Sequence, residues 1–295
     1  MATVPLHVPL DDPAIAGINR AQALWRTMRK KPLGAFSAAL LVVIVLMAIF
    51  ADVLAPYDPL ATQPEIRLSA PSRAHPFGTD DIGRDVLSRI IYGARISLWV
   101  GLLAVGIGTA AGMVIGLLCG YCEGRLDLIG QRVMDAIQAI PGLVLALAIV
   151  SVLKPNTTNA MLAIAMVIIP GNSRIVRGAV LSAKQNRYVE AAQAMGCRHP
   201  RIILTHILPN VTAPILVIAS IWLGNAILIE ATLSFLGVGL RSPVVSWGIM
   251  ISESQDYIRV SLFLLLFPAA FLVTAVLSFV MLGEAVREAL DPKLR

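Results

Sequence analysis

The side chains that could do chemistry are few in this chain, and their spacing excludes most kinds of active site. No H-E-x-x-H or G-x-S-x-G sequence occurs, and there is no G-x-x-x-x-G-K-[ST] loop to hold nucleotide phosphates. Cys119 and Cys122 form a single C-x-x-C pair, without the second pair of ligands that a structural zinc site needs. The histidines lack metal-ligand spacing: His7, His75, His199 and His206. The sequence therefore predicts no catalytic residue, no metal site and no cofactor bound by this chain.

A polar and basic segment between two apolar runs has the spacing of an ordered loop: YVEAAQAMGCRHPRIILTHILPN, residues 188–210. The apolar positions of its first part recur at helical spacing: Tyr188, Ala191, Ala192 and Met195. This pattern predicts a short helix that presents Glu190 on a polar side. Gly196 follows, and it allows the backbone to turn where a Cβ would obstruct it.

The second part of the same segment predicts another short helix, from Arg198 to Leu208. Pro209 can begin the helix after it, because the missing N–H has no cost in a first turn. From the residues alone, two interpretations of this pair of helices remain open. The pair is a docking surface for another protein, or it lies on the lipid surface as an amphipathic segment.

Glu230 is the carboxylate that lies well inside an apolar run, in the sequence LIEATLSFLGVG. An ionisable side chain at membrane depth is a functional candidate by default. It has two candidate roles, hydrogen bonding between helices and lining or gating a passage.

The elements that must position these residues are membrane helices. Mean hydropathy is +0.78, and 14% of the residues are charged, where soluble domains have about 25%. Six charge-free runs are near or above the length of about 18 residues that spans a bilayer as a helix. They are 33–51, 96–122, 136–153, 155–173, 207–229 and 260–283. The sequence predicts an all-α membrane protein with six transmembrane helices, in which Pro170-Gly171 interrupts the fourth run.

The distribution of the 24 lysines and arginines predicts the orientation of these helices. Most of them fall on the cytosolic side if both termini are cytosolic, which is the positive-inside pattern. The net charge of +6 therefore indicates contact with anionic membrane lipid and not binding of nucleic acid. We expect a multi-pass protein of the bacterial plasma (inner) membrane.

This orientation divides the chain into five parts. A cytosolic head covers 1–32, the first transmembrane helix 33–55, and an extracytoplasmic segment 56–95. This segment is proline-dense at first and then predicts an amphipathic helix that starts near Thr79 and Asp80. A core of five helices covers 96–283 and includes a cytosolic loop at 181–209, and a cytosolic tail covers 284–295.

Small and helix-breaking residues add detail to the core. Glycines of the second run predict a close helix-packing face: Gly101, Gly106, Gly108, Gly112 and Gly116. Pro141, Pro170 and Pro268 indicate either breaks that line a cavity or plain structural kinks.

The order Glu190-Ala191-Ala192, Gly196 and Leu208-Pro209 resembles the EAA loop of ABC-transporter permeases. His206 stands where the general pattern has Ile, and the resulting HILPN is similar to the peptide/nickel branch. Three further stretches resemble the C-type subunit of dipeptide and oligopeptide permeases. They are HPFGTDDIGRDVLSRIIYGARISL at 75–98, PGNSRIVRG at 170–178 and EATLSFLGVG at 230–239.

The resemblance implies the architecture of a type I ABC importer permease that forms half of a translocation path for di- and oligopeptides. It implies three kinds of protein partner: a homologous B-type permease, two ABC ATPase subunits that bind ATP and Mg, and an extracytoplasmic substrate-binding protein. It also implies the residues of an ATPase-coupling loop: Glu190, Ala191, Ala192, Gly196, His206, Leu208 and Pro209.

Other functions stay open at this point. Within the same class, the solute could be nickel, glutathione or another small molecule. An ion-coupled secondary transporter is a second class, disfavoured by sparse intramembrane charge and by the lack of a visible internal repeat. An intramembrane enzyme is a third, disfavoured because no pair of catalytic residue types shares a run at useful spacing.

Overall fold

The structure is a computed structural model that describes residues 32–240 and 243–290 of the 295. Apart from Pro32, the expected cytosolic head lies outside the described residues, and so does the end of the tail at 291–295. In the described ranges the regular elements are helices, with one isolated antiparallel bridge between Thr79 and Asp85. The predicted all-α fold is confirmed.

Each of the six predicted apolar runs corresponds to a helix or a helix pair. The bounds are α2 (Pro32–Ile49), α3 (Ala51–Leu54), α4 (Val86–Cys122), α5 (Gly124–Gln138), α6 (Gly142–Leu153), α7 (Thr157–Lys184), α10 (Leu208–Phe235) and α12 (Phe263–Leu290). Four of these, α4, α7, α10 and α12, contain stretches long and apolar enough to cross a membrane. The α2 helix is shorter and also apolar, and α5 with α6 forms a bent pair.

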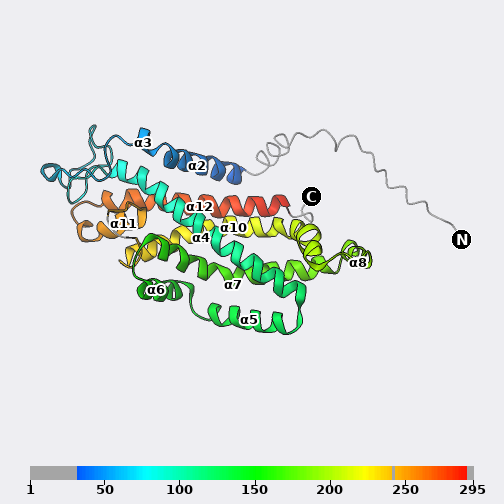
Figure 1. Cartoon of the computed structure of the whole chain (residues 1–295). Coiled ribbons are helices and arrows are strands. Elements are labelled where there is room, and N and C mark those ends of the chain that lie inside the picture. The colour runs from blue at the N-terminus through cyan, green and yellow to red at the C-terminus, as the bar shows by residue number, and fades with distance from the viewer. Residues whose placement is uncertain (1–31, 241–242, 291–295) are drawn as a thin grey trace, which may run out of the picture.

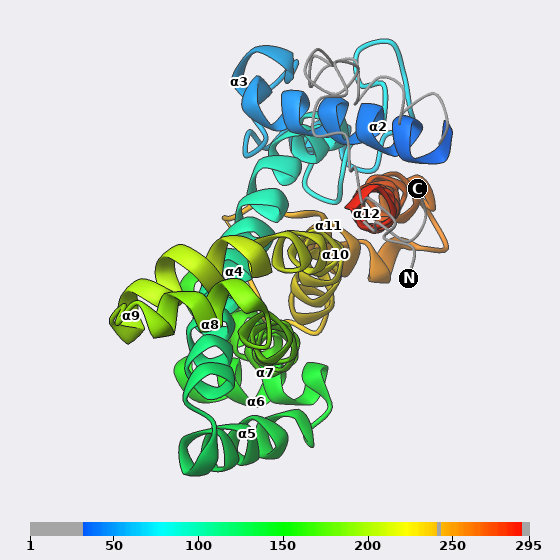
Figure 2. The same ribbon diagram turned by 90° about the vertical axis from the view of Figure 1, so that its right-hand side faces the viewer.

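The helices form an elongated bundle with the connecting loops at its two ends (Figures 1 and 2). In Figure 2, α2 lies at one edge of the bundle and α5 at the opposite edge, with α12, α10 and α7 between them. The α11 helix (Trp247–Glu253) and the loop that precedes α4 lie at one end of the bundle, whereas α8 (Arg187–Ala194) lies at the other. The segments 56–95 and 188–210 thus lie at opposite ends of the bundle, and their placement on opposite sides of the membrane stays a prediction.

The second apolar run is part of one helix of 37 residues, about 55 Å long. This helix, α4, begins at Val86, later than the start near Thr79 and Asp80 that we expected. Asp85 caps it, because a carboxylate oxygen of Asp85 accepts 2.8 Å hydrogen bonds from the backbone N–H and the hydroxyl of Ser88. The expected amphipathic helix and the second span are therefore one continuous helix.

The third apolar run, expected as one span over 136–153, is broken. The helices α5 and α6 meet at an angle of 87° across residues 139–141. The break lies at Pro141, which restricts the residue before it to non-helical conformations and lacks a backbone N–H. The 12 residues of α6 rise only about 18 Å, so α6 does not cross a bilayer alone.

The two other prolines do not break their helices. The α7 helix runs without interruption through Pro170 and Gly171, contrary to the interruption that we expected there, and α12 runs through Pro268. Of the three prolines, only Pro141 lies at a helix boundary.

Glycines of α4 form the predicted packing face, and its partner is α7. A Cβ on Gly108 would lie 2.8 Å from Cβ of Ile168, and one on Gly116 would lie 2.5 Å from the carbonyl oxygen of Ser173. Contacts this short show that the two backbones approach as closely as a glycine face permits. Gly106 has open space instead and belongs to another side of α4.

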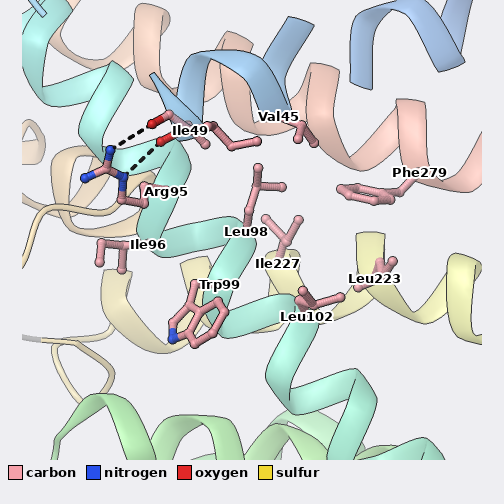
Figure 3. A pocket seen from close by; sticks show the side chains of 11 residues that line it. Val45, Ile49, Arg95, Ile96, Leu98, Trp99, Leu102, Leu223, Ile227 and Phe279 are labelled. Carbon is pink, nitrogen blue, oxygen red and sulfur yellow. Dashed lines mark hydrogen bonds between the residues drawn. The ribbon is translucent and has the colours of Figure 1, made fainter. Parts of the chain in front are cut away.

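Arg95 of α4 attaches α2 to the bundle (Figure 3). Its guanidinium donates to the carbonyl oxygens of Ala48 (2.9 Å) and Ile49 (3.1 Å) and forms an ion pair with Asp52 at 3.0 Å. An apolar groove of about 620 Å³ opens beside it among α2, α4, α10 and α12, with Trp99 and Phe279 in its lining.

Candidate functional site

The segment that resembles an EAA loop forms an ordered helical projection at one end of the bundle (Figure 1). Its first helix, α8, ends in a turn at Gly196, whose φ of +75° lies in the left-handed region. The N–H of Gly196 donates to Gln193 and that of Cys197 to Ala192, which closes the C-terminus of α8. A Cβ at Gly196 would meet no atom within 4 Å, so glycine is required here by conformation and not by space.

The inner face of α8 packs into a small apolar core. Val189 and Ala192 are 0% and 1% exposed and contact a cluster that includes Val180 of α7 together with Ile202 and Ile207. Of the predicted apolar stripe, only Ala192 lies in this core, and Val189 takes the inward position in place of Tyr188. α8 is thus held to α7 and to the segment that leads into α10.

The outer face of α8 is unpartnered in the described part of the chain. Tyr188 and Met195 are 40% and 75% exposed, and Glu190 and Ala191 are also exposed. We call these four residues the α8 surface. It combines apolar side chains with a carboxylate on a rigid helix, which suits a protein partner.

The second predicted helix does not end before Pro209. The chain is helical from α9 (His199–Arg201) through a π-helical stretch (Ile202–Ile207) into α10. Within that stretch the N–H of Leu208 donates to the carbonyl of Ile203, five residues back. Pro209 cannot donate, and its ring needs room at the preceding turn, which the wider π-helix supplies. The loop is therefore continuous with the membrane helix α10.

The other predicted residues of this loop lie along that continuous helix. His206 is half-buried, and its carbonyl oxygen accepts a 2.6 Å hydrogen bond from the side-chain amide of Asn210. Leu208 is half-buried and packs against the same apolar cluster as α8. The structure thus brings the predicted loop residues into one unit that contains both surface and core positions.

Sequence reasoning missed the contact that fixes this unit to α4. The hydroxyl of Tyr121 lies 2.7 Å from Nδ1 of His199, and Lys184 Nζ donates to the carbonyl oxygen of Tyr121 at 2.9 Å. Tyr121 and His199 are 78 positions apart, so no local pattern connects them.

Glu230 lies away from this loop, inside α10, and is fully buried in the chain. Its carboxylate accepts hydrogen bonds from the hydroxyls of Ser234 (2.9 Å), Ser246 (3.0 Å) and Ser97 (3.4 Å). The carboxylate therefore joins α10 to α4 and to the N-cap of α11. A role in lining or gating a passage stays a prediction.

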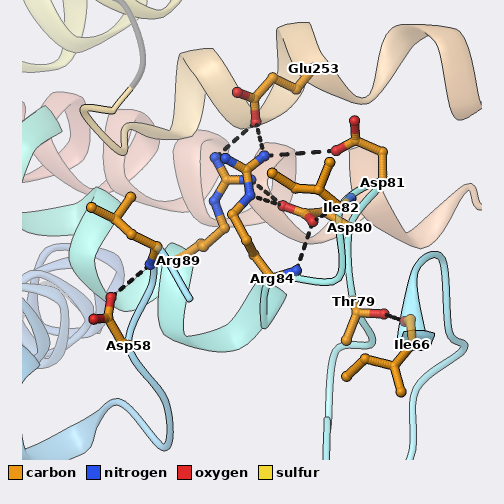
Figure 4. Close-up of polar contacts among 10 residues, drawn as sticks. Asp58, Ile66, Thr79, Asp80, Asp81, Ile82, Arg84, Arg89 and Glu253 are labelled. Carbon is orange, nitrogen blue, oxygen red and sulfur yellow. Dashed lines mark hydrogen bonds and ion pairs between the residues drawn. The ribbon is translucent and has the colours of Figure 1, made fainter. Parts of the chain in front are cut away.

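A second polar cluster, also missed, lies at the opposite end of the bundle (Figure 4). Arg84 Nε lies 2.5 Å from a carboxylate oxygen of Asp80, which also pairs with Arg89. Both guanidiniums reach Glu253 of α11, at 3.0 Å and 2.8 Å. Burial, followed by the charge of Asp80, raises the pKa of the neighbouring Asp81. These pairs connect the loop before α4 to α11, and the TDDIGRD stretch (79–85) that we interpreted as a helix start supplies most of them.

Within the described residues, no group of three or more His, Cys, Asp or Glu side chains could hold a metal ion. Cys119 is buried and Cys122 is exposed, and both are free thiols.

A bundle of apolar helices, four of which are long enough to cross a membrane, with an ordered helical projection at one end is the architecture of a multi-pass membrane protein. The chain belongs to the family of binding-protein-dependent transport system inner membrane components, whose model matches residues 112–295. Residues 19–71 match the N-terminal transmembrane domain of oligopeptide transport permease C. The protein is therefore an ABC-transporter permease of the C type, located in the inner membrane.

Curated relatives agree along nearly the whole chain. A dipeptide transport system permease protein of Alkalihalophilus pseudofirmus is 40% identical over 100% of this chain and 97% of its own length. A probable D,D-dipeptide transport system permease protein of Escherichia coli is 40% identical over 93% of this chain and 92% of its own. A glutathione transport system permease protein of Pectobacterium atrosepticum is 38% identical over 92% and 90%.

Solved structures share the fold at low identity. The MetNI methionine ABC transporter, in an inward-facing conformation, superposes with a TM-score of 0.59 at 18% identity, over 70% of this chain and 98% of that one. An amino acid ABC transporter superposes with a TM-score of 0.53 at 21% identity, over 67% and 92%. The ABC importer permease fold is thereby confirmed.

Proposed function

We propose that this chain is the permease subunit of an ATP-driven importer and forms half of the translocation path for di- and oligopeptides. The relatives named as dipeptide permeases support the substrate class. The observation that carries the coupling role is the two-sided build of α8, which packs against the bundle on one face and leaves Tyr188, Glu190, Ala191 and Met195 open on the other.

The partners in this proposal are a homologous B-type permease, two ABC ATPase subunits and an extracytoplasmic substrate-binding protein. ATP and Mg²⁺ bind to the ATPase subunits, and hydrolysis takes place there. In this proposal the chain contributes only contact surfaces and helices, because its sequence has no loop that could hold nucleotide phosphates.

The loop residues divide into two roles. Glu190 and Ala191 are exposed and contact the ATPase, whereas Ala192, Gly196, His206, Leu208 and Pro209 hold the contact surface in place. Because α8 is packed against both α7 and the start of α10, a displacement of the ATPase moves these helices as rigid bodies. The bundle then alternates between outward and inward access as a two-state element.

Glutathione is a second candidate solute. Relatives named as glutathione transport system permease proteins are 38% and 39% identical to this chain, close to the 38% to 40% of relatives named as dipeptide permeases. Glutathione is itself a short peptide with free charged groups, so both candidates share one chemistry.

A pull-down from the native membrane in mild detergent tests the proposal. The tagged chain is expected to recover a second permease and an ATPase with a phosphate-binding loop, and the Met195→Glu variant to lose the ATPase while it keeps the permease. The reason is that a carboxylate in place of a 75% exposed apolar side chain penalises burial at an interface.

The matched control is Leu60→Glu, which places the same charge on an exposed leucine in the loop between α3 and α4, far from α8. It is expected to recover both partners. A wild-type chain that purifies without any ATPase, with uptake abolished by an uncoupler and insensitive to ATP depletion, would instead establish an ion-coupled carrier.

A further inference from the structure

A polar groove of about 540 Å³ lies between α5 and α7. The α5 helix lies beside the part of α7 that is nearer the α8 end of the bundle (Figure 1). Its charged and amide lining consists of Asp127, Gln131, Arg132, Asp135, Arg174 and Arg177. The more exposed members of this lining, Arg132, Arg174 and Asp135, have no role in the fold described above.

Two ion pairs cross the groove, and they differ in strength. Arg177 pairs with Asp127 through two contacts of 2.5 Å, and the Asp127 side chain is only 14% exposed. Arg174 pairs with Asp135 through one contact of 2.6 Å, and these side chains are 54% and 45% exposed. The first pair has the bidentate geometry of a structural contact, whereas the second is open and readily exchanged.

The attachment of α5 to the bundle is largely polar. Met134 is its one buried residue, and Gln131 adds a 3.3 Å hydrogen bond to the hydroxyl of Ser173. Most of the large exposed apolar residues of α5 lie outside the groove lining, namely Leu126, Ile129 and Val133, whereas Leu128 belongs to it. The groove therefore runs along the polar side of an amphipathic helix.

The charged lining lies just outside the predicted apolar runs 136–153 and 155–173, on the side that the charge pattern predicts to be cytosolic. Exposed charges there stay hydrated, because burying them without partners would be costly, so the groove holds water. Arg132 is exposed and forms no ion pair with any residue that the structure describes. With three arginines and two aspartates in the lining, the groove has one positive charge in excess.

We propose that this groove is part of the aqueous passage and is a transient binding site for a zwitterionic solute, a short peptide with free termini. The inference rests on the proposed function and names the residues that the solute contacts. Arg132 and Arg174 bind the peptide carboxylate, and Asp135 binds its ammonium group.

The geometry suits a site that releases what it binds. Arg174 donates one N–H to Asp135 and keeps other donors free, so a carboxylate can bind before the ion pair breaks. The exposed pair contributes only about 0 to 1 kcal/mol, and exchanging it for contacts to the ligand therefore costs little. A passage requires such weak binding, because a tightly held solute does not leave.

The test is accessibility of a cysteine in the groove of the assembled transporter. In a variant with serine at positions 119, 122 and 197, Gln131→Cys is treated with a water-soluble methanethiosulfonate, with and without the dipeptide alanyl-alanine. We expect labelling that the dipeptide slows about tenfold, and no protection by the same dipeptide blocked at both termini. In the Arg174→Gln variant, protection is expected to need about tenfold more dipeptide.

Ile129→Cys is the matched control, since Ile129 is 61% exposed on α5 and outside the groove lining. Its labelling rate is expected to be the same with and without dipeptide. Failure of Gln131→Cys to react, or equal protection by the blocked dipeptide, overturns the inference. ATP-dependent uptake of alanyl-alanine in the same proteoliposomes separates the two proposals. Uptake without protection overturns this inference alone, and absence of both also removes the proposed function.

Discussion

Buried charged residues of this protein have hydrogen-bond partners within the chain. Glu230 shows the principle, since three serine hydroxyls from different parts of the chain donate to one buried carboxylate. An acceptor removed from such a set leaves buried donors unpaired, at a cost of about 1 to 3 kcal/mol.

We therefore predict that Glu230→Leu destabilises the protein by about 2 kcal/mol, whereas Glu230→Gln, which keeps an acceptor oxygen, costs less. Thermal unfolding of the purified complex in detergent measures the difference. Equal stability of Glu230→Leu and wild type would show that the hydrogen bonds do not hold the helices together. If Glu230→Gln is stable but does not transport, Glu230 has the passage role as well.

The α4 and α7 helices pack closely against each other, because glycines of α4, which have no side chain, let the two backbones approach. Gly108, Gly112 and Gly116 bring the two backbones together, and the side-chain amide of Asn172 donates to the hydroxyl of Thr109 at 2.9 Å across the contact. The α5 helix is the opposite case, since polar contacts attach it and the break at Pro141 separates it from α6.

Two glycines of α4, Gly112 and Gly106, test the packing face between α4 and α7. Gly112→Val places a Cβ 2.8 Å from Cβ of Asn172 and 2.9 Å from the carbonyl oxygen of Ile169, and neither atom is the end of a flexible side chain. We expect destabilisation by about 1 to 3 kcal/mol, typical of an overpacked core, and a lower yield of folded protein. Gly106→Val, where a Cβ meets nothing within 4 Å, is expected to unfold at nearly the wild-type temperature. Equal effects of the two substitutions would contradict the packing face.

Across the whole molecule, α4 and α10 connect two ordered ends. At one end, Arg84 and Arg89 bind Glu253 and fix the loop before α4 to α11. At the other end, α8 and the π-helical stretch are packed against α7 and α10. In the proposed mechanism, a displacement of α8 reaches the opposite end of the bundle through these continuous helices.

Gly196 tests this long-range coupling. Gly196→Val forces a β-branched residue into the left-handed region, with a strain of about 1 to 2 kcal/mol, and displaces α8 from its position. We expect solute uptake to fall strongly while membrane insertion and assembly with the second permease persist. Gly196→Asn is the control, because asparagine tolerates this conformation. Wild-type uptake by Gly196→Val would defeat the coupling role.

The sequence by itself determined the helical membrane class, the six apolar segments and the position of the loop at 188–210. These features depend on local composition and on the spacing of residues that are close in the sequence. It also identified Gly108, Gly112 and Gly116 of α4 as part of a packing face, since their spacing of four places them on one side of a helix.

Only the tertiary structure decided which partner each feature meets. It assigned α7 to the α4 glycines, turned Val189 inward in place of Tyr188, and continued the loop helix through Pro209 by a π-helical stretch. It also gathered Asp80, Arg84 and Arg89 around Glu253, and it opened the groove between α5 and α7. The physical reason is that these contacts join residues far apart in the chain, whose meeting depends on how the helices pack and not on any local pattern.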